Sequence, residues 1–192
     1  MQPHIPLDLP HRRERRFVIP SVDELLALLA PHVERVFFSA NEHVETLYFN
    51  NDDHDLPFDV SLRARRYLPA AGVPALDLAA EYFWEVKTGS ASIKSKHRTR
   101  ERLGDIIAHL NAEQFTAAPL RPYVATTYHR RHYVSLAMAG TRLTVDDDIR
   151  YYFFPPGAAV AVSIGAQGQP RVEVKERTQT AGQWPRVEAL LR

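Results

Sequence analysis

The segment RVEVKER, residues 171–177, places an acid and a base two positions apart with a valine between them. The same Glu-Val-Lys tripeptide occurs in FWEVKTG, residues 83–89. Side chains alternate between the two faces of a β-strand. Glu173 and Lys175 therefore share one face, whereas the valines of the segment share the other. Both segments are predicted to be strands with one charged face and one apolar face.

Six segments of the chain show this alternation. The charged faces carry Glu14 and Arg16, then Arg63 and Arg65, Glu85 and Lys87, Lys94, Lys96 and Arg98, Arg142, Thr144, Asp146 and Asp148, and finally Glu173, Lys175 and Arg177. The apolar faces carry Leu62, Ala64, Tyr82, Trp84, Val86, Leu143, Val145, Val172 and Val174. For any single strand, the charged face can be explained as the solvent-exposed face of an antiparallel sheet. However, adjacent arginines on one face repel each other unless they share an anion, so the repeated basic pairs favour an anion-binding surface.

Hydrophobic periodicity predicts about eight strands and three helices. Residues 1–11 are read as a mobile leader, and residues 12–192 as one domain. Ser21 and Glu24 form a capping box before a helix over 22–30. A second helix is predicted over 101–115 and a third over 184–192. This order of elements predicts an antiparallel-rich α+β domain or a closed barrel.

In a closed barrel all the charged faces can point into one lumen, because interior and exterior positions alternate along every strand of a barrel. Desolvated charges without partners cost several kcal/mol each, so such a lumen must be wet and must bind something oppositely charged. A polyanion held with a divalent metal fits both signs. Arginine and lysine bind phosphoryl oxygens, and carboxylates hold Mg²⁺ or Mn²⁺.

The overall composition excludes several function classes. The 24 Lys and Arg against 23 Asp and Glu give a net charge of +1, which predicts no nucleic acid partner. The absence of cysteine excludes thiolate zinc sites and favours a cytoplasmic location. No apolar run approaches the roughly 20 residues of a membrane-spanning helix, so any membrane role would need a separate partner protein.

Eight ordered motifs resemble one known family. They are ERRF (14–17), LYFNN (47–51), SLRARRY (61–67), WEVKT (84–88), IKSKHR (93–98), TTYHRRHY (126–133), TRLTVDDDI (141–149) and VEVKER (172–177). The set resembles the vacuolar transporter chaperone (VTC) domain of polyphosphate polymerases, within the CYTH-like superfamily of triphosphate tunnel metalloenzymes. The resemblance implies a closed eight-stranded antiparallel β-barrel with flanking helices and a tunnel lined by alternating charges.

The resemblance also implies roles for individual residues. The expected catalytic residues are Arg63, Arg65, Lys87, Arg130, Arg142 and Glu173. The expected substrate-binding residues are Arg16, Lys94, Lys96, Arg98 and Lys175. Glu173 looks like the metal-holding glutamate of the family, and Glu85 either assists it or orients Lys87. Glu14 and Asp146 are further metal candidates from the residue pattern, although the run 146–148 is nearly as well explained as a solvated cluster near a turn. Arg16 stands where the family usually has lysine, so its phosphate contact is expected to differ.

The leading hypothesis is a phosphotransferase that depends on Mn²⁺ or Mg²⁺ and moves the γ-phosphate of ATP, or of another nucleoside triphosphate, onto polyphosphate. A triphosphatase would use the same residues with water as the acceptor, positioned by Glu14 or Glu85. A non-catalytic polyphosphate or nucleotide sensor is the third reading. His129 and His132 fall on opposite faces, so they are read as ordinary strand residues. The aromatic run 151–154 is expected to pack at a core edge.

Overall fold

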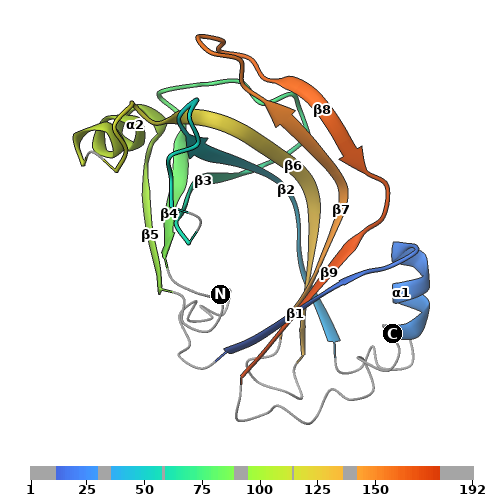
Figure 1. The fold of residues 1–192 in the computed structure, drawn as a ribbon. Helices are drawn as coiled ribbons and strands as arrows, with labels where there is room; N and C mark the ends of the chain where they lie inside the picture. Colours follow the sequence, from blue (N-terminus) through green and yellow to red (C-terminus); the bar gives the residue numbers. More distant parts are fainter. Residues whose placement is uncertain are drawn as a thin grey trace. The chain divides into compact units, whose positions relative to one another are not determined.

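The computed structural model describes residues 12–29, 36–57, 59–88, 95–113, 115–135 and 142–177 (Figure 1). The strands are β1 (Arg12–Val18), β2 (Val36–Asn50), β3 (Ser61–Leu68), β4 (Glu81–Thr88), β5 (Ser95–Arg102), β6 (Arg121–Ser135), β7 (Arg142–Phe153), β8 (Val162–Gln167) and β9 (Arg171–Arg177). The helices are α1 (Val22–Leu29) and α2 (Leu103–Ala112). The leader over 1–11 and the helix expected over 184–192 lie outside the described residues.

The strands form one sheet in the order β1-β9-β7-β6-β2-β3-β4-β5, with β8 attached to β7. The antiparallel character predicted from the sequence is confirmed. The closed eight-stranded barrel is not: the sheet has nine strands, and its order runs as an open path from β1 to β5 through the described part of the chain. The additional strand, β8, was not predicted, because its sequence VSIGAQ has no alternation of charged and apolar residues.

The contacts divide the chain into two compact units. The first unit comprises residues 1–41, 130–147 and 168–192, and the second comprises 42–129 and 148–167. In the first unit, β9 pairs with β1 on one side and with β7 on the other. Its core contains Ile19, Leu25, Tyr133, Leu143, Val145, Val172 and Val174. The predicted cap of α1 is confirmed by a 3.1 Å hydrogen bond from the Glu24 amide to Ser21 Oγ.

The second unit is built on β2, β3, β4 and β5, which pair in succession along the chain. Its main core contains Leu47, Phe49, Leu62, Ala64, Tyr82 and Trp84, joined by Leu103, Ile106 and Leu110 of α2. Figure 1 shows α2 beside β4 and β5. This helix begins two residues later than predicted, because β5 continues through Arg102.

The predicted division into charged and apolar faces holds through most of the sheet, but β7 departs from it at Asp148. Here φ is +48°, which breaks the regular alternation of the strand. Asp148 is exposed and pairs with Arg150, whereas Asp146 is buried. Beyond this point Tyr152 and the adjoining Phe154 pack into the core of the second unit, as expected for the aromatic run.

Neither described helix has the length and apolar character needed to cross a bilayer.

Candidate functional site

A row of side chains crosses four strands of the second unit on the charged face. The strand register places Tyr48 of β2 opposite Arg63 of β3, Arg63 opposite Glu85 of β4, and Glu85 opposite Arg98 of β5. Directly opposed side chains in antiparallel strands lie close enough to interact. The sequence alternation predicted which face each residue occupies, and the register brings three of the predicted site residues into direct contact.

Glu85 lies between two arginines and is only 1% exposed. Its Oε2 accepts a 2.6 Å hydrogen bond from Arg63 Nε, and the same oxygen forms an ion pair with an Arg63 Nη2 group. Arg98 approaches the other carboxylate oxygen less closely, with its Nε 3.5 Å from Oε1. The Arg98 guanidinium also lies over the Phe83 ring, 3.9 Å from the ring centroid. Glu85 therefore holds Arg63 firmly and Arg98 more loosely.

Arg65 and Lys87 extend this basic surface along β3 and β4. Arg65 is 9% exposed and donates a 3.1 Å hydrogen bond from Nε to the hydroxyl of Thr46. Lys87 lies opposite Ser61 on one side and Lys96 on the other. Four predicted basic residues, Arg63, Arg65, Lys87 and Arg98, thus share one face with Glu85. Several arginine and lysine side chains gathered on one strand face favour the binding of an anion.

The first unit contains a second charged group, centred on Glu173. This carboxylate is 8% exposed, and its Oε2 lies 2.8 Å from Lys175 Nζ. The Arg16 Nε lies 3.6 Å from the other oxygen, although the Arg16 side chain is mostly exposed. In the register, Glu173 lies between Arg16 of β1 and Thr144 of β7. The structure therefore brings Glu173, Lys175 and Arg16 together as the sequence pattern indicated.

Arg130 and Asp146 form a buried bidentate pair in the same unit. Arg130 donates from Nε and Nη2 to the two oxygens of Asp146, at 2.6 and 2.7 Å. The neighbouring Arg131 pairs with Asp147 at 2.9 Å. Asp146, a candidate metal ligand in the sequence, thus holds the Arg130 guanidinium in one orientation, and its metal role stays a prediction. Arg142 of β7 lies opposite Lys175 and is half-buried.

The side chains of three predicted site residues lie outside the described part of the structure. Glu14 lies in β1 opposite Lys175, and Lys96 lies in β5 opposite Lys87, but their side chains are outside the described set. Lys94 lies wholly outside it. The roles of these residues stay predictions.

A polar network on the opposite, apolar face of the second unit was missed by sequence reasoning. Glu45 is 2% exposed and accepts hydrogen bonds from Arg66 at 2.7 and 3.2 Å and from the Tyr82 hydroxyl at 2.7 Å. Burial raises the pKa of Tyr82 well above its usual value, and the adjacent Glu45 carboxylate adds to the shift. The signal in the sequence was that Glu45 and Arg66 each interrupt an otherwise apolar strand face with opposite charge.

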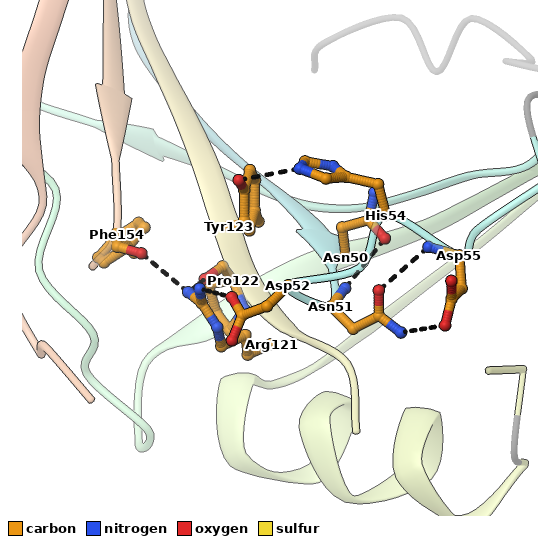
Figure 2. A network of polar contacts seen from close by, with 9 residues as sticks. All are labelled: Asn50, Asn51, Asp52, His54, Asp55, Arg121, Pro122, Tyr123 and Phe154. Carbon is orange, nitrogen blue, oxygen red and sulfur yellow. Dashed lines mark hydrogen bonds and ion pairs between the residues drawn. The ribbon is translucent and has the colours of Figure 1, made fainter. Parts of the chain in front are cut away.

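A further network fixes the turn after β2 (Figure 2). Arg121 forms an ion pair with Asp52 and donates a 2.8 Å hydrogen bond to the Phe154 carbonyl. The Tyr123 hydroxyl lies 3.0 Å from His54 Nε2, and His54 has a positive φ of 58°. These contacts join the β2–β3 turn to the beginning of β6 and the end of β7. The network therefore has a structural role, because it ties this turn to the two strands.

The described carboxylates suit a divalent metal that is held jointly by the protein and by phosphate oxygens. They suit a metal held by protein side chains alone less well. No group of three His, Asp or Glu side chains is arranged for metal binding among the residues described. Mg²⁺ is commonly bound through one or two carboxylates together with substrate phosphates and water. Glu173 has this character, because it is a buried carboxylate beside cationic groups that suit phosphate oxygens.

Comparison with known proteins supports the fold. No protein-family model and no curated protein matches the sequence. A proposed adenylate cyclase from Vibrio parahaemolyticus is structurally similar with a TM-score of 0.55 at 16% identity, covering 94% of this chain and 84% of that one. A proposed adenylyl cyclase from Hippeastrum, described as having a dominant triphosphatase activity, gives 0.46 at 15% identity, covering 93% and 83%. The first likeness shows that the two chains share a fold.

Proposed function

We propose that this chain binds the triphosphate group of a nucleoside triphosphate and, with Mg²⁺ or Mn²⁺, transfers its terminal phosphoryl group. The observation that carries the proposal is the basic face of β3, β4 and β5, where Arg63 and Arg98 flank Glu85 and Arg65 lies beside them. The planar guanidinium group of arginine can donate two hydrogen bonds to the oxygens of one phosphate group. Several arginines on one surface can therefore bind several phosphate groups. The solved relative from Vibrio parahaemolyticus is named for a reaction that consumes ATP.

The acceptor we propose is the end of a polyphosphate chain, on the strength of the eight ordered motifs described above. A terminal phosphate oxygen of that chain forms the new bond to the γ-phosphorus, and the bond from this phosphorus to the bridging oxygen breaks to release the nucleoside diphosphate. No nucleophilic side chain is needed. Arg63 and Arg65 bind phosphoryl oxygens, and the orientation of Arg63 is fixed in advance by Glu85.

The carboxylate of Glu173 is the residue we assign to the metal. A divalent ion bound there would neutralise charge on the phosphate oxygens that it contacts. Lys175 and Arg16, both paired with Glu173 here, would hold phosphate oxygens near the same point. Asp146 keeps the Arg130 fork in one orientation, which makes it a positioning residue in this proposal.

The test is ³¹P NMR of products formed from ATP and Mn²⁺ or Mg²⁺ by the wild-type protein and by a double variant, Arg63→Ala with Arg65→Ala. The expected result is polyphosphate and ADP from the wild type and a loss of at least about 100-fold in the variant. Arg150→Ala is the matched control, because Arg150 is exposed and pairs with Asp148 of its own strand, β7. Equal turnover by the double variant would refute the proposed site.

The same spectra separate the competing functions. Orthophosphate and ADP without polymer would show a triphosphatase, with water as the acceptor. Cyclic AMP and pyrophosphate would show the cyclase reaction for which the structural relatives are named. Retained ATP binding without turnover at any metal concentration would indicate a sensor.

A further inference from the structure

The outer strand β8 belongs to neither charged group. It pairs with β7 along one side, and the strand order places no strand along its other side within the described chain. The segment 74–76 meets residues 159–161 through hydrogen bonds from Leu76 N to Ala159 O at 2.8 Å and from Ala161 N to Pro74 O at 3.0 Å. This contact stops just before β8 begins. Among the residues that the structure describes, the outer edge of β8 is therefore an open sheet edge.

Large apolar side chains surround this edge. Val160, Val162 and Ile164 are 56, 54 and 61% exposed, and Val73, next to the segment that meets residues 159–161, is 59% exposed. We call these four residues the β8 patch. Single exposed aliphatic residues are common on protein surfaces, but a group gathered on an open strand edge marks an interaction site.

The edge also lacks the usual protection against pairing. Open strands in soluble proteins commonly carry lysine, other charges or proline. Residues 151–170 contain no Asp, Glu, Lys, Arg or His, and the first charged residues on either side are Arg150 and Arg171. A bulge is present, because Ser163 pairs with Tyr152 and Gly165 with Tyr151, which leaves Ile164 as the additional residue. The bulge shortens any ladder that can form but leaves Ile164 largely exposed.

We propose that β8 pairs antiparallel with β8 of a second copy of this chain, across a two-fold axis near Ile164. In this arrangement Val162 of one copy lies beside Ala166 of the other, and the two Ile164 side chains meet. The charge pattern favours this partner: 24% of the chain is charged, yet this edge is uncharged and meets its own copy without repulsion. A charged peptide would find no complementary group on β8.

The first test is sedimentation equilibrium of the wild type over a range of concentrations, compared with Val162→Lys combined with Ile164→Lys. The wild type is expected to form dimers, and the double variant to raise the dimer dissociation constant by at least about tenfold, since lysines on both copies repel. Leu78→Lys is the matched control, because Leu78 is 58% exposed in the same unit but outside the patch. Circular dichroism confirms that each variant is folded.

A second test uses the absence of cysteine from the chain. Ile164→Cys should form a disulfide-linked dimer under mild oxidation, whereas Leu78→Cys should stay largely monomeric. Three results would overturn the proposal: a wild type that is monomeric at all concentrations, a dimer that the lysine double variant leaves intact, or equal cross-linking at both positions. Monomers that bind neutral phosphatidylcholine vesicles through the patch would also overturn it, in favour of a lipid surface.

Discussion

Arg65 and Arg66 are neighbours in β3 but have opposite surroundings. Arg66 lies on the apolar face, where it is held by two hydrogen bonds to buried Glu45 and lies over the Tyr82 ring at 4.9 Å. Arg65 lies on the charged face, where its Nε donates to the neutral hydroxyl of Thr46. Because a strand turns successive side chains to opposite faces, two arginines one position apart meet different surroundings. We propose that Arg66 serves stability and that Arg65 serves phosphate binding.

The largest expected effect is on the apolar face. Glu45→Ala removes the carboxylate that pairs with Arg66 and accepts from Tyr82, so it should lower the free energy of unfolding by about 3–5 kcal/mol. Urea denaturation would measure the change. The matched control is Glu81→Ala, which breaks the exposed pair with Arg100 and should cost less than about 1 kcal/mol. Similar losses in the two variants would show that burial does not distinguish these pairs.

Arg65→Ala should have the converse phenotype. We expect turnover of ATP to fall by about 10²–10³-fold, as for the loss of one donor to a developing anion, while the unfolding midpoint moves much less than in Glu45→Ala. Steady-state kinetics and urea denaturation on the same preparation check both quantities. If Arg65→Ala mainly unfolded the protein and kept its specific activity, the assignment of the two faces would be reversed.

Glu85→Gln tests whether the carboxylate between Arg63 and Arg98 positions these arginines or holds metal. As a positioning residue, its loss should lower kcat roughly tenfold, which is about 1.4 kcal/mol of transition-state stabilisation. The Mn²⁺ concentration for half-maximal activity should not change. A large rise in the metal requirement with kcat preserved at saturating metal would instead assign Glu85 to the metal.

The smallest effect concerns Tyr82 at alkaline pH. Its pKa is raised in the folded protein, by burial first and then by Glu45. Above a pH of about 10 the unfolded chain releases the phenol proton while the folded chain retains it, so stability falls as pH rises. Tyr82→Phe should flatten this alkaline decline, as measured by urea midpoints at pH 8 and pH 10.5. An identical decline in both proteins would show that another group is responsible.

Much of the sheet could be predicted because alternation is a local property of a strand. Arg63, Glu85 and Arg98 were placed on charged faces from sequence parity alone, and Leu143 and Val172 on apolar faces. The alternation within a strand does not predict the register between neighbouring strands. The contact of Glu85 with both arginines depends on how β3, β4 and β5 are aligned with one another, and nothing within one strand encodes this alignment.

Two features were missed for different physical reasons. The Glu45–Arg66 pair breaks the parity rule, since both charges lie on the apolar face and become acceptable only by meeting each other. Strand β8 has little alternation and little burial, so its strand structure comes from pairing with β7 rather than from its own composition. The distinction between polymerase and triphosphatase could not be predicted because both reactions use the same basic residues.

The pairing of β1 with β9 has a consequence for how the protein is made. Arg16 is synthesised well before Glu173, its partner in the register, which lies 157 residues later in the sequence. Strands β3, β4 and β5 are consecutive, so the contacts of Glu85 close short loops and can form early. A ribosome-bound chain can thus assemble arginines for phosphate well before it has the carboxylate we assign to the metal. On the assignments proposed above, anion binding by the second unit would precede metal binding by the first.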